Sequence, residues 1–540
     1  MALPALSSIG MESTSVLSEP AGLAPARPDG FWHPAAIVFV SNMCVMVIEL
    51  VAGRLVAPLV GNSLYTWTSI IGVILAGISL GNYIGGRLAD KYASRRFLGV
   101  TFLLAALGSL SVLLLVEVVG SQGLPLINIP LVSRMILFIT LIFFLPSVLL
   151  GLISPIVIKL TLNNLAKTGN IIGRIYAASS LGSIVGTFAT GYFLISWFGS
   201  RSVVVGVSVL LAVMGLLLGQ WFRSSGRALL ASVLIIVLGT ALMAAPPARA
   251  FLSGECLVES DYYCIKVRDD KFEGVDYKVL TLDHLVHSYN AVGDPLKLRY
   301  SYEQVGAELA QFLIDRDGQL NTLFIGGGGY TLPRYIEALW SDAKIDVAEV
   351  DPAVTRVVFE HMDVPHNPNI ISYNMDARQY LISTAGSKRY NFILGDAFND
   401  FSVPYHLTTK EFNQLVRDHL ADNGIYMLNL IDGGELPFAT AVMRTLRSVF
   451  PYVYFLPVNK AYQNTQRNTM LVLASPQPID MVKLGMIPGS DRIRQSADWW
   501  VSQDKLDALL SQGPQFLLTD DYVPTEQLLT PVFESANAVK

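Results

Sequence analysis

Seven long apolar runs occupy the first half of the chain, and they restrict the fold more than any other feature. The runs cover residues 35–58, 64–86, 97–119, 135–160, 172–197, 202–222 and 228–246. A helix needs roughly 20 apolar residues to cross the core of a lipid bilayer. Only 15% of the 540 residues are charged, against about a quarter in an ordinary soluble protein. The sequence therefore predicts a seven-helix transmembrane domain over residues 35–246, with the lipid bilayer as its partner.

The first 34 residues differ from the rest of this half. Residues 1–34 contain Ser, Pro and Gly with little periodicity. A signal peptide would carry a basic segment ahead of an apolar one, and none is present there. We expect a disordered N-terminal tail.

Small residues recur inside the second and fifth apolar runs. Gly77, Gly81 and Gly85 follow a GxxxGxxxG pattern, and Gly182 and Gly186 repeat the same spacing. Such patterns allow transmembrane helices to approach closely. The glycines therefore predict helix packing.

Two charged residues, Glu49 and Arg54, lie in the first run. A charge within a bilayer is costly unless it is paired or hydrated. Two interpretations stay open: an ion pair inside the bundle, or a polar pathway for a substrate or an ion.

Basic residues in short loops set the expected orientation, because cytoplasmic loops carry an excess of Lys and Arg. The loops after the second, fourth and sixth runs, with their flanks, hold Lys91, Arg95, Arg96, Lys159, Lys167, Arg174, Arg223 and Arg227. We expect a multi-pass protein of the inner membrane with its N-terminus in the cytoplasm. After seven spans the soluble half lies outside. Cys256 and Cys264 are disulfide candidates in that oxidising compartment, whereas Cys44 lies within the first run.

The pattern changes after residue 255. Residues 262–270 and 277–289 predict a β-hairpin in a small β domain over 255–300, and residues 301–540 predict an α/β domain. The expected strands are 322–326, 345–350, 370–374, 391–395 and 424–430, alternating with expected helices 332–340, 352–361, 377–384, 408–420 and 437–449; 453–457 and 469–474 close the sheet as a hairpin. Such alternation implies a doubly wound, mostly parallel sheet.

Acidic residues and a glycine loop fall at the ends of the expected strands, where ligands of such sheets bind. The stretch LFIGGGGYTLPRY places Gly326, Gly327, Gly328 and Gly329 after the first strand. Glu349, Asp376 and Asp396 end the next three strands. Glu349 stands about 20 residues beyond the loop, the place of a carboxylate that binds ribose hydroxyls. A purely structural role as helix caps would explain one or two of these acids.

The acids also favour one class of nucleoside. A dinucleotide places its pyrophosphate at the helix N-terminus and needs no acids after the third and fourth strands. A sulfonium nucleoside carries no phosphate and suits an acidic site. The set therefore favours S-adenosylmethionine, or its decarboxylated form, over NAD. The mild net charge of −5 gives no sign of nucleic-acid binding.

Several motifs in this half resemble those of spermidine synthases, in the same order. They are ESDYYCIKV, LDHLVHS, FIGGGGYTLPR, AEVDPAV, MDAR, GDAF and LTDDYVP, and they cover about residues 258–526. With the apolar runs ahead of them, the chain resembles the bacterial membrane-fused spermidine synthase-like proteins. The resemblance implies a class I methyltransferase-like Rossmann domain that follows a multi-pass helical bundle and a small N-terminal β layer.

The resemblance also implies roles for individual residues. Glu349 would hold the ribose, Asp376 and Ala377 the adenine, and Asp396 would take a proton from the attacking amine. Asp351 joins the nucleoside-binding set through its motif. The residues that the resemblance assigns to the substrate are Tyr302, His287, Tyr330, Asn399, Asp520 and Asp521. Tyr302, Glu303 and Gln304 fall near the family's tyrosine-rich substrate motif.

Three departures from the family pattern lie at the substrate end. The family carries an Asp in the glycine loop where this chain has Gly329, followed by the bulky Tyr330. The second Asp of the fourth-strand motif is Asn399, and His284 and His287 replace a Gly and a Gln. The two histidines lack an obvious third partner, so we expect no metal.

Three functions stay open at this point. The first is an aminopropyltransferase that uses decarboxylated S-adenosylmethionine and an amine such as a polyamine. The second is a methyltransferase or a lyase that uses S-adenosylmethionine. The third is a transporter or sensor whose soluble domain only binds the nucleoside. The sequence does not decide whether the chain forms a homo-oligomer.

Overall fold

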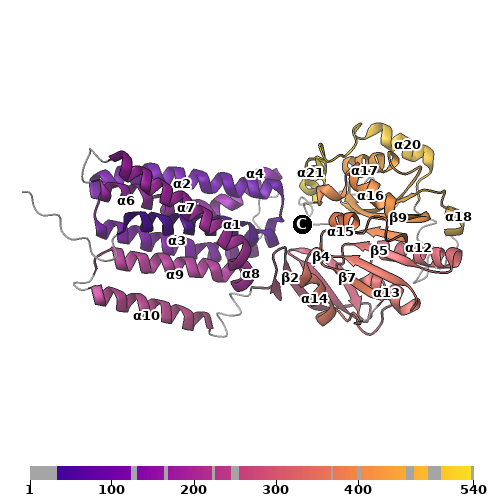
Figure 1. Cartoon of the computed structure of the whole chain (residues 1–540), viewed down its shortest axis with the longest axis horizontal. Helices are drawn as coiled ribbons and strands as arrows, with labels where there is room; N and C mark the ends of the chain where they lie inside the picture. Colours follow the sequence, from indigo (N-terminus) through magenta and orange to yellow (C-terminus); the bar gives the residue numbers. More distant parts are fainter. Residues whose placement is uncertain are drawn as a thin grey trace, which may run out of the picture.

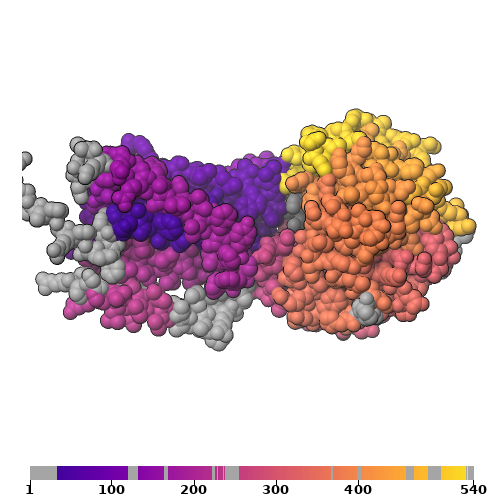
Figure 2. Space-filling view, viewed as in Figure 1, coloured from indigo at the N-terminus to yellow at the C-terminus, as the bar shows by residue number. Residues whose placement is uncertain are grey.

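The computed structural model describes residues 33–122, 130–162, 168–221, 225–244, 254–366, 369–397, 403–457, 467–484 and 500–536. Its two halves form separate lobes that meet at one end of the helical bundle (Figure 2). The predicted tail, apart from residues 33–34, lies outside the described residues.

The first lobe is a bundle of long helices (Figure 1). It contains α1 (Pro34–Val60), α2 (Leu64–Tyr92), α3 (Arg95–Gln122), α4 (Leu131–Ile139), η1 (Thr140–Phe144), α5 (Leu145–Gly151), α6 (Ile153–Thr161), α7 (Thr168–Ala189), η3 (Thr190–Leu194), α8 (Ile195–Phe198), α9 (Ser200–Leu218) and α10 (Ser225–Ala244). Among the described residues, six helical stretches are long and apolar enough to cross a membrane. They correspond to the first six predicted runs. The seventh run falls mainly on α10, and its last two residues, 245–246, lie outside the described residues.

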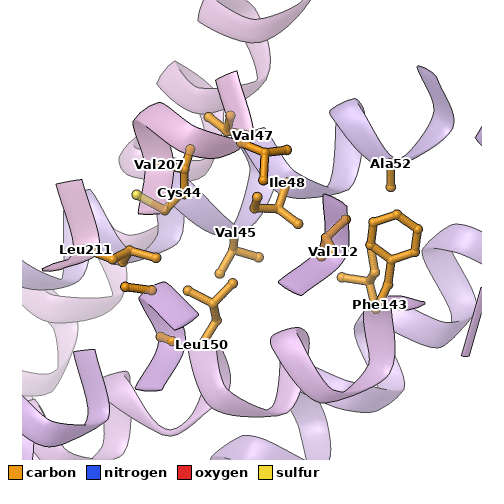
Figure 3. Close-up of a cluster of buried hydrophobic side chains, with 14 of the residues drawn as sticks. Cys44, Val45, Val47, Ile48, Ala52, Val112, Phe143, Leu150, Val207 and Leu211 are labelled. Atoms are coloured by element: carbon orange, nitrogen blue, oxygen red, sulfur yellow. The ribbon is translucent and has the colours of Figure 1, made fainter. Parts of the chain in front are cut away.

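The glycines of the bundle lie at close helix contacts, as their spacing predicts. A Cβ atom added to Gly77 would lie 2.7 Å from the Ser147 side chain, and one added to Gly186 would lie 2.6 Å from the Met43 carbonyl. These contacts join α2 to α5 and α7 to α1. Around them the interior is apolar, and Figure 3 shows side chains such as Val45, Ile48 and Leu150 gathered there.

The second lobe begins with a four-stranded antiparallel sheet of β1 (Val258–Glu259), β2 (Cys264–Phe272), β3 (Val275–Leu282) and β4 (Leu285–Ala291). The predicted single strand 277–289 is wrong. It is two strands, because Asp283 adopts a positive φ of 53° and the chain turns there. The Asp283 carboxylate supports the turn by accepting a hydrogen bond from the Cys264 N–H at 3.0 Å. His284 consequently lies in an exposed turn, apart from His287 on β4.

A seven-stranded sheet forms the centre of this lobe, with the order β10-β11-β9-β8-β5-β6-β7. Its strands are β5 (Asn321–Ile325), β6 (Lys344–Ala348), β7 (Ile370–Tyr373), β8 (Tyr390–Gly395), β9 (Leu420–Asp432), β10 (Tyr452–Pro457) and β11 (Asn468–Ser475). The five strands from β9 to β7 are parallel, and β10 and β11 close the sheet as an antiparallel hairpin. The predicted fold class, an apolar helical bundle followed by a Rossmann-like domain, is confirmed.

Helices cover both faces of this sheet. Apolar residues of α12 (Ser301–Asp317), α13 (Thr331–Leu339), α14 (Pro352–His361) and α18 (Met481–Leu484) pack on one face. Those of α15 (Ala377–Ser383), α16 (Lys410–His419), α17 (Pro437–Arg447), α20 (Gln503–Gln512) and α21 (Thr525–Ala536) pack on the other. The strand order reverses between β5 and β8, which is where sheets of this kind bind ligands.

The α/β lobe is attached to the end of the bundle at which α1 ends and α2 begins. Arg54 of α1 bonds to the carbonyls of Ser260 and Tyr262, and Glu526 of α21 accepts a hydrogen bond from the Leu64 N–H at 2.9 Å. Because α1 starts at the opposite end (Figure 1), the start of α1 and the α/β lobe lie at opposite ends of the bundle. Arg54 therefore faces the second lobe, which favours neither of the two interpretations of Glu49 and Arg54.

Candidate active site

A cavity of about 630 Å³ lies at the carboxyl ends of β5, β6 and β8. The predicted site residues that line it are Gly326, Gly327, Gly328, Glu349, Asp376, Ala377, Asp396, Tyr302 and His287. The fold thus brings the glycine loop and three strand-end acids into one space. The cavity lies where the strand order of the sheet reverses, between β5 and β8.

The glycine loop comes too close to its neighbours for larger residues. Gly326 has a φ of 95°, and a Cβ atom there would lie 2.6 Å from the Asp396 carbonyl. The Gly327 N–H donates to Glu349 Oε2 at 2.8 Å, and the Gly329 N–H donates to Ser288 Oγ at 2.7 Å. A Cβ atom on Gly329 would clash with the Ser288 side chain. The loop therefore has no room for the family's Asp while Ser288 stays in place.

Glu349 is held between two backbone N–H groups. Its Oε2 accepts from Gly327, and its Oε1 accepts from the Asp351 N–H at 3.0 Å. Burial raises the pKa of Glu349, and these hydrogen bonds oppose the rise. Both carboxylate oxygens are thus fixed at the end of β6, in contact with the cavity.

Asp351 and Asp376 both cap helices, so the structural interpretation holds in part for each. Asp351 accepts from the Ala353 N–H at 2.8 Å and lies outside the cavity lining. Asp376 accepts from the Arg378 N–H at 2.9 Å, but it also lines the cavity beside Ala377. The His406 ring lies 2.7 Å from Asp376 and lowers its pKa.

Asp396 is the acid at the end of β8. The Asn429 side chain donates to Asp396 Oδ1 at 2.7 Å, and Tyr302 also bonds to this carboxylate. Burial raises the pKa of Asp396 to about 6, while the bonds from Asn429 and Tyr302 oppose the rise. The Asn429 Oδ1 is buried without a hydrogen-bond partner among the described residues. A carboxylate with this pKa is largely ionised at neutral pH and can accept a proton.

Glu303 is a second buried acid beside Asp396. It is 2% exposed and lines the same cavity. Burial raises its pKa to about 8, and the charge of Asp396 adds to the rise. Glu303 bonds to Thr331 at the start of α13. Its neighbour Gln304 instead donates to the Leu298 carbonyl at 3.0 Å and lies outside the cavity lining.

Three of the predicted substrate residues are not brought to the cavity lining. Tyr330 is fully buried behind the loop, where its hydroxyl donates to Ser372 at 2.9 Å. Asp520 is exposed and pairs with Arg378, and Asp521 is exposed as well. Asn399 lies outside the described residues.

Other lining residues were not predicted. They are Ser288 on β4, His406, Asn429 on β9, and Arg467 and Asn468 before and at the start of β11. Ser288 ends the LDHLVHS motif. No local motif marks the other four, because each reaches the cavity from a distant segment only after the sheet has formed. Among the described residues, no group of three or more His, Cys, Asp or Glu side chains could hold a metal ion.

The chain is similar to known transferases. No family model matches the chain. It is 28% identical over 251 residues to a polyamine aminopropyltransferase of Vibrio vulnificus, covering 46% of this chain and 78% of the relative. It is 23% identical over 421 residues to polyamine aminopropyltransferase 2 of Ralstonia nicotianae, covering 72% of this chain and 77% of the relative. Homology to the polyamine aminopropyltransferases is supported at modest identity.

The Ralstonia match is longer than the α/β lobe and its β layer, so it includes part of the helical half. A methyltransferase is also similar: the N-terminal histidine N-methyltransferase of Emericella nidulans is 27% identical over 203 residues, covering 35% of each chain. Among solved structures, a probable spermidine synthase from Corynebacterium glutamicum aligns with a TM-score of 0.43 at 20% identity, covering 49% of this chain and 98% of its own. The relatives support an enzyme of the S-adenosylmethionine-related transferases.

Proposed function

We propose that the chain is a membrane-bound aminopropyltransferase that uses decarboxylated S-adenosylmethionine and an amine acceptor. The observation that carries the proposal is the position of Asp396. This carboxylate is buried, is oriented by Asn429 and Tyr302, and lies in the same cavity as the glycine loop and Glu349. The site thus combines a nucleoside-binding edge with a general base.

In this reaction the acceptor nitrogen attacks the carbon next to the sulfonium sulfur. A C–N bond forms, the C–S bond breaks, and its electron pair stays on the sulfur of the leaving methylthioadenosine. The proton of the attacking amine passes to Asp396 and then to solvent. Glu349 binds the ribose, and Asp376 with Ala377 binds the adenine. The ionised carboxylate of Asp396 gives the reaction end a negative charge, which suits a cationic amine.

Methyl transfer is the second candidate, and two observations favour it. Methyltransferases are among the relatives, and Gly329 stands where the family has the Asp that contacts the donor amine. A methyltransferase would use intact S-adenosylmethionine and would release S-adenosylhomocysteine. The product therefore distinguishes the two reactions.

The test is product analysis by the purified full-length chain in detergent. It is incubated with decarboxylated S-adenosylmethionine and a diamine, or with S-adenosylmethionine and the same diamine. We expect methylthioadenosine and an elongated polyamine from the first mixture only. S-adenosylhomocysteine from the second mixture would instead establish methyl transfer. Nucleoside binding without any product would contradict both and leave a sensor or transporter.

A further inference from the structure

A disulfide-closed loop lies between the membrane bundle and the cavity. Cys256 and Cys264 are joined by a disulfide, with 5.2 Å between their Cα atoms. We call residues 256–264 the clamp loop. The residues enclosed by the disulfide include Glu259, Ser260, Asp261, Tyr262 and Tyr263.

On one side, the clamp loop is bonded to the helical bundle. Arg54 Nη1 donates to the Tyr262 carbonyl at 2.5 Å, and Nη2 donates to the Ser260 carbonyl at 2.6 Å. Two further contacts join Ser196 of α8 to Asp261, and Ser200 of α9 to Glu259. Three helices thus hold one short loop, and α1 is distant in sequence from the consecutive helices α8 and α9.

On its other side, the same loop forms part of the nucleoside site. The Tyr262 and Tyr263 side chains line the cavity. Ser260 Oγ donates to Asp351 Oδ2 at 2.5 Å, and the Asp351 N–H donates to Glu349 Oε1 at 3.0 Å. A continuous chain of hydrogen bonds therefore runs from Arg54 in the bundle to Glu349, the residue that we propose to bind the ribose.

We propose that the membrane bundle positions the nucleoside site through the clamp loop, with Arg54 as the positioning residue. The inference rests on the proposed nucleoside site. Binding a nucleoside requires the wall formed by Tyr262 and Tyr263 and the carboxylate of Glu349 to be in place together. The disulfide closes the loop to a few residues, so a displacement of its bundle side moves its cavity side as well.

Arginine suits this position for a geometric reason. Its planar guanidinium presents donors in a fixed fork, and here two of them reach two carbonyls of one loop. A lysine carries the same charge but offers a single ammonium point, which cannot reproduce the fork. Arg54→Lys therefore separates the geometry of the contact from its charge.

The test measures methylthioadenosine binding to the full-length chain in detergent by calorimetry. Arg54→Lys should weaken binding on the order of fivefold or more, within the usual range of coupling between connected sites. The matched control is Glu526→Gln, which loosens the contact between α21 and Leu64 without touching the clamp loop. It should bind the nucleoside like the unmodified chain.

Two further readouts distinguish positioning from a general loss of stability. In the transferase assay, Arg54→Lys should raise KM for the nucleoside and leave kcat within about twofold. The bonds that connect the loop to the site lead to Asp351 and Glu349, whereas Asp396 is oriented by Asn429 and Tyr302. The double variant Cys256→Ser/Cys264→Ser should weaken binding in the same way. Adding Arg54→Lys to it should have little further effect, since both changes act on one element.

Three results would overturn the inference. One is unchanged nucleoside affinity in Arg54→Lys. Another is an equal loss of methylthioadenosine affinity in Glu526→Gln, which would mean that any loosened contact between the two lobes weakens binding. The third is full additivity of the Arg54 and cysteine changes. If the unmodified chain binds neither methylthioadenosine nor S-adenosylmethionine, the proposed function itself fails, and the inference fails with it.

Discussion

The two lobes bury polar groups in opposite ways. In the bundle, several hydroxyl groups are satisfied by a nearby helix carbonyl: Ser69, Thr101 and Ser147 each donate to the carbonyl four residues earlier. In the α/β lobe, Glu303 and Asp396 are buried side by side. Their pKa values rise because hydrogen bonds only partly offset the cost of burying a charged carboxylate. Perturbed acids that line a cavity indicate a functional site. The difference supports a functional site in the second lobe.

Glycine also serves different purposes in the two lobes. Gly81 of α2 brings its helix backbone against the Val148 carbonyl of α5, so it permits helix packing. Gly327 brings its backbone N–H to the Glu349 carboxylate, at the wall of the cavity. One lobe uses missing side chains for helix contacts, and the other uses them to bring a loop backbone against a carboxylate at the cavity wall.

The largest expected effect is that of Asp396→Asn. If Asp396 is the general base, turnover should fall by roughly 10²–10⁴, while methylthioadenosine affinity stays close to that of the unmodified chain. Steady-state kinetics and calorimetry on the same preparation measure both quantities. Unchanged turnover would reduce Asp396 to a binding or structural residue.

Asp480→Asn is the control for this change. Asp480 is an exposed acid that pairs with Lys483 at 3.7 Å, far from the cavity lining. It should alter neither turnover nor binding.

The folded chain raises the pKa of Asp396 from 3.8 to about 6, so this group costs stability as the pH rises through that window. Asp396→Asn should therefore not lower the unfolding temperature above pH 6.

The pH dependence of the rate is the next effect. Burial raises the pKa of Asp396 to about 6, and a protonated carboxyl cannot accept a proton from the amine. We expect kcat to fall roughly tenfold for each pH unit below that value. A rate profile of the unmodified chain between pH 5 and 8 checks this. A flat profile would exclude Asp396 as the titrating base.

Glu349→Ala should weaken nucleoside binding. Loss of charged hydrogen bonds to ribose should cost about 1.5–3 kcal/mol, or roughly tenfold or more in affinity. Calorimetry with methylthioadenosine measures the change, and the exposed Glu360→Ala on α14 is the control. Equal binding by Glu349→Ala, or a preference of the unmodified chain for NAD, would refute the assignment of this edge.

Sequence patterns predicted the features that depend on local periodicity and strand ends. The apolar runs gave the bundle, and the position of Asp396 after its strand placed it in the cavity. Tyr330 was assigned to the substrate although it packs behind the loop, because a sequence does not show on which side of a loop a side chain lies. Asn429 was missed because its contact with Asp396 depends on the pairing of β8 with β9. The split at Asp283 depends on one positive φ angle within an otherwise continuous strand pattern.

The smallest effect on stability is expected from the disulfide, which also bears on the compartment of the second lobe. Cys256 and Cys264 enclose a loop of only a few residues, so reduction should destabilise the lobe by about 2–3 kcal/mol at most. Thermal unfolding with and without reductant measures this. The disulfide also indicates on which side of the membrane the lobe lies, because disulfides form and persist in oxidising compartments.

Thiol labelling of intact cells with an impermeant reagent tests that topology. The start of α1 and the α/β lobe lie at opposite ends of the bundle, and basic loops predict a cytoplasmic N-terminus. We therefore expect labelling of Cys256 and Cys264 only after reduction of intact cells. A Cys44→Ser background removes the buried free thiol of the bundle as a source of signal. Labelling that needs lysis but no reductant would place the lobe in the cytoplasm with free thiols. The whole bundle would then be inverted, and the loop charges would not set its orientation.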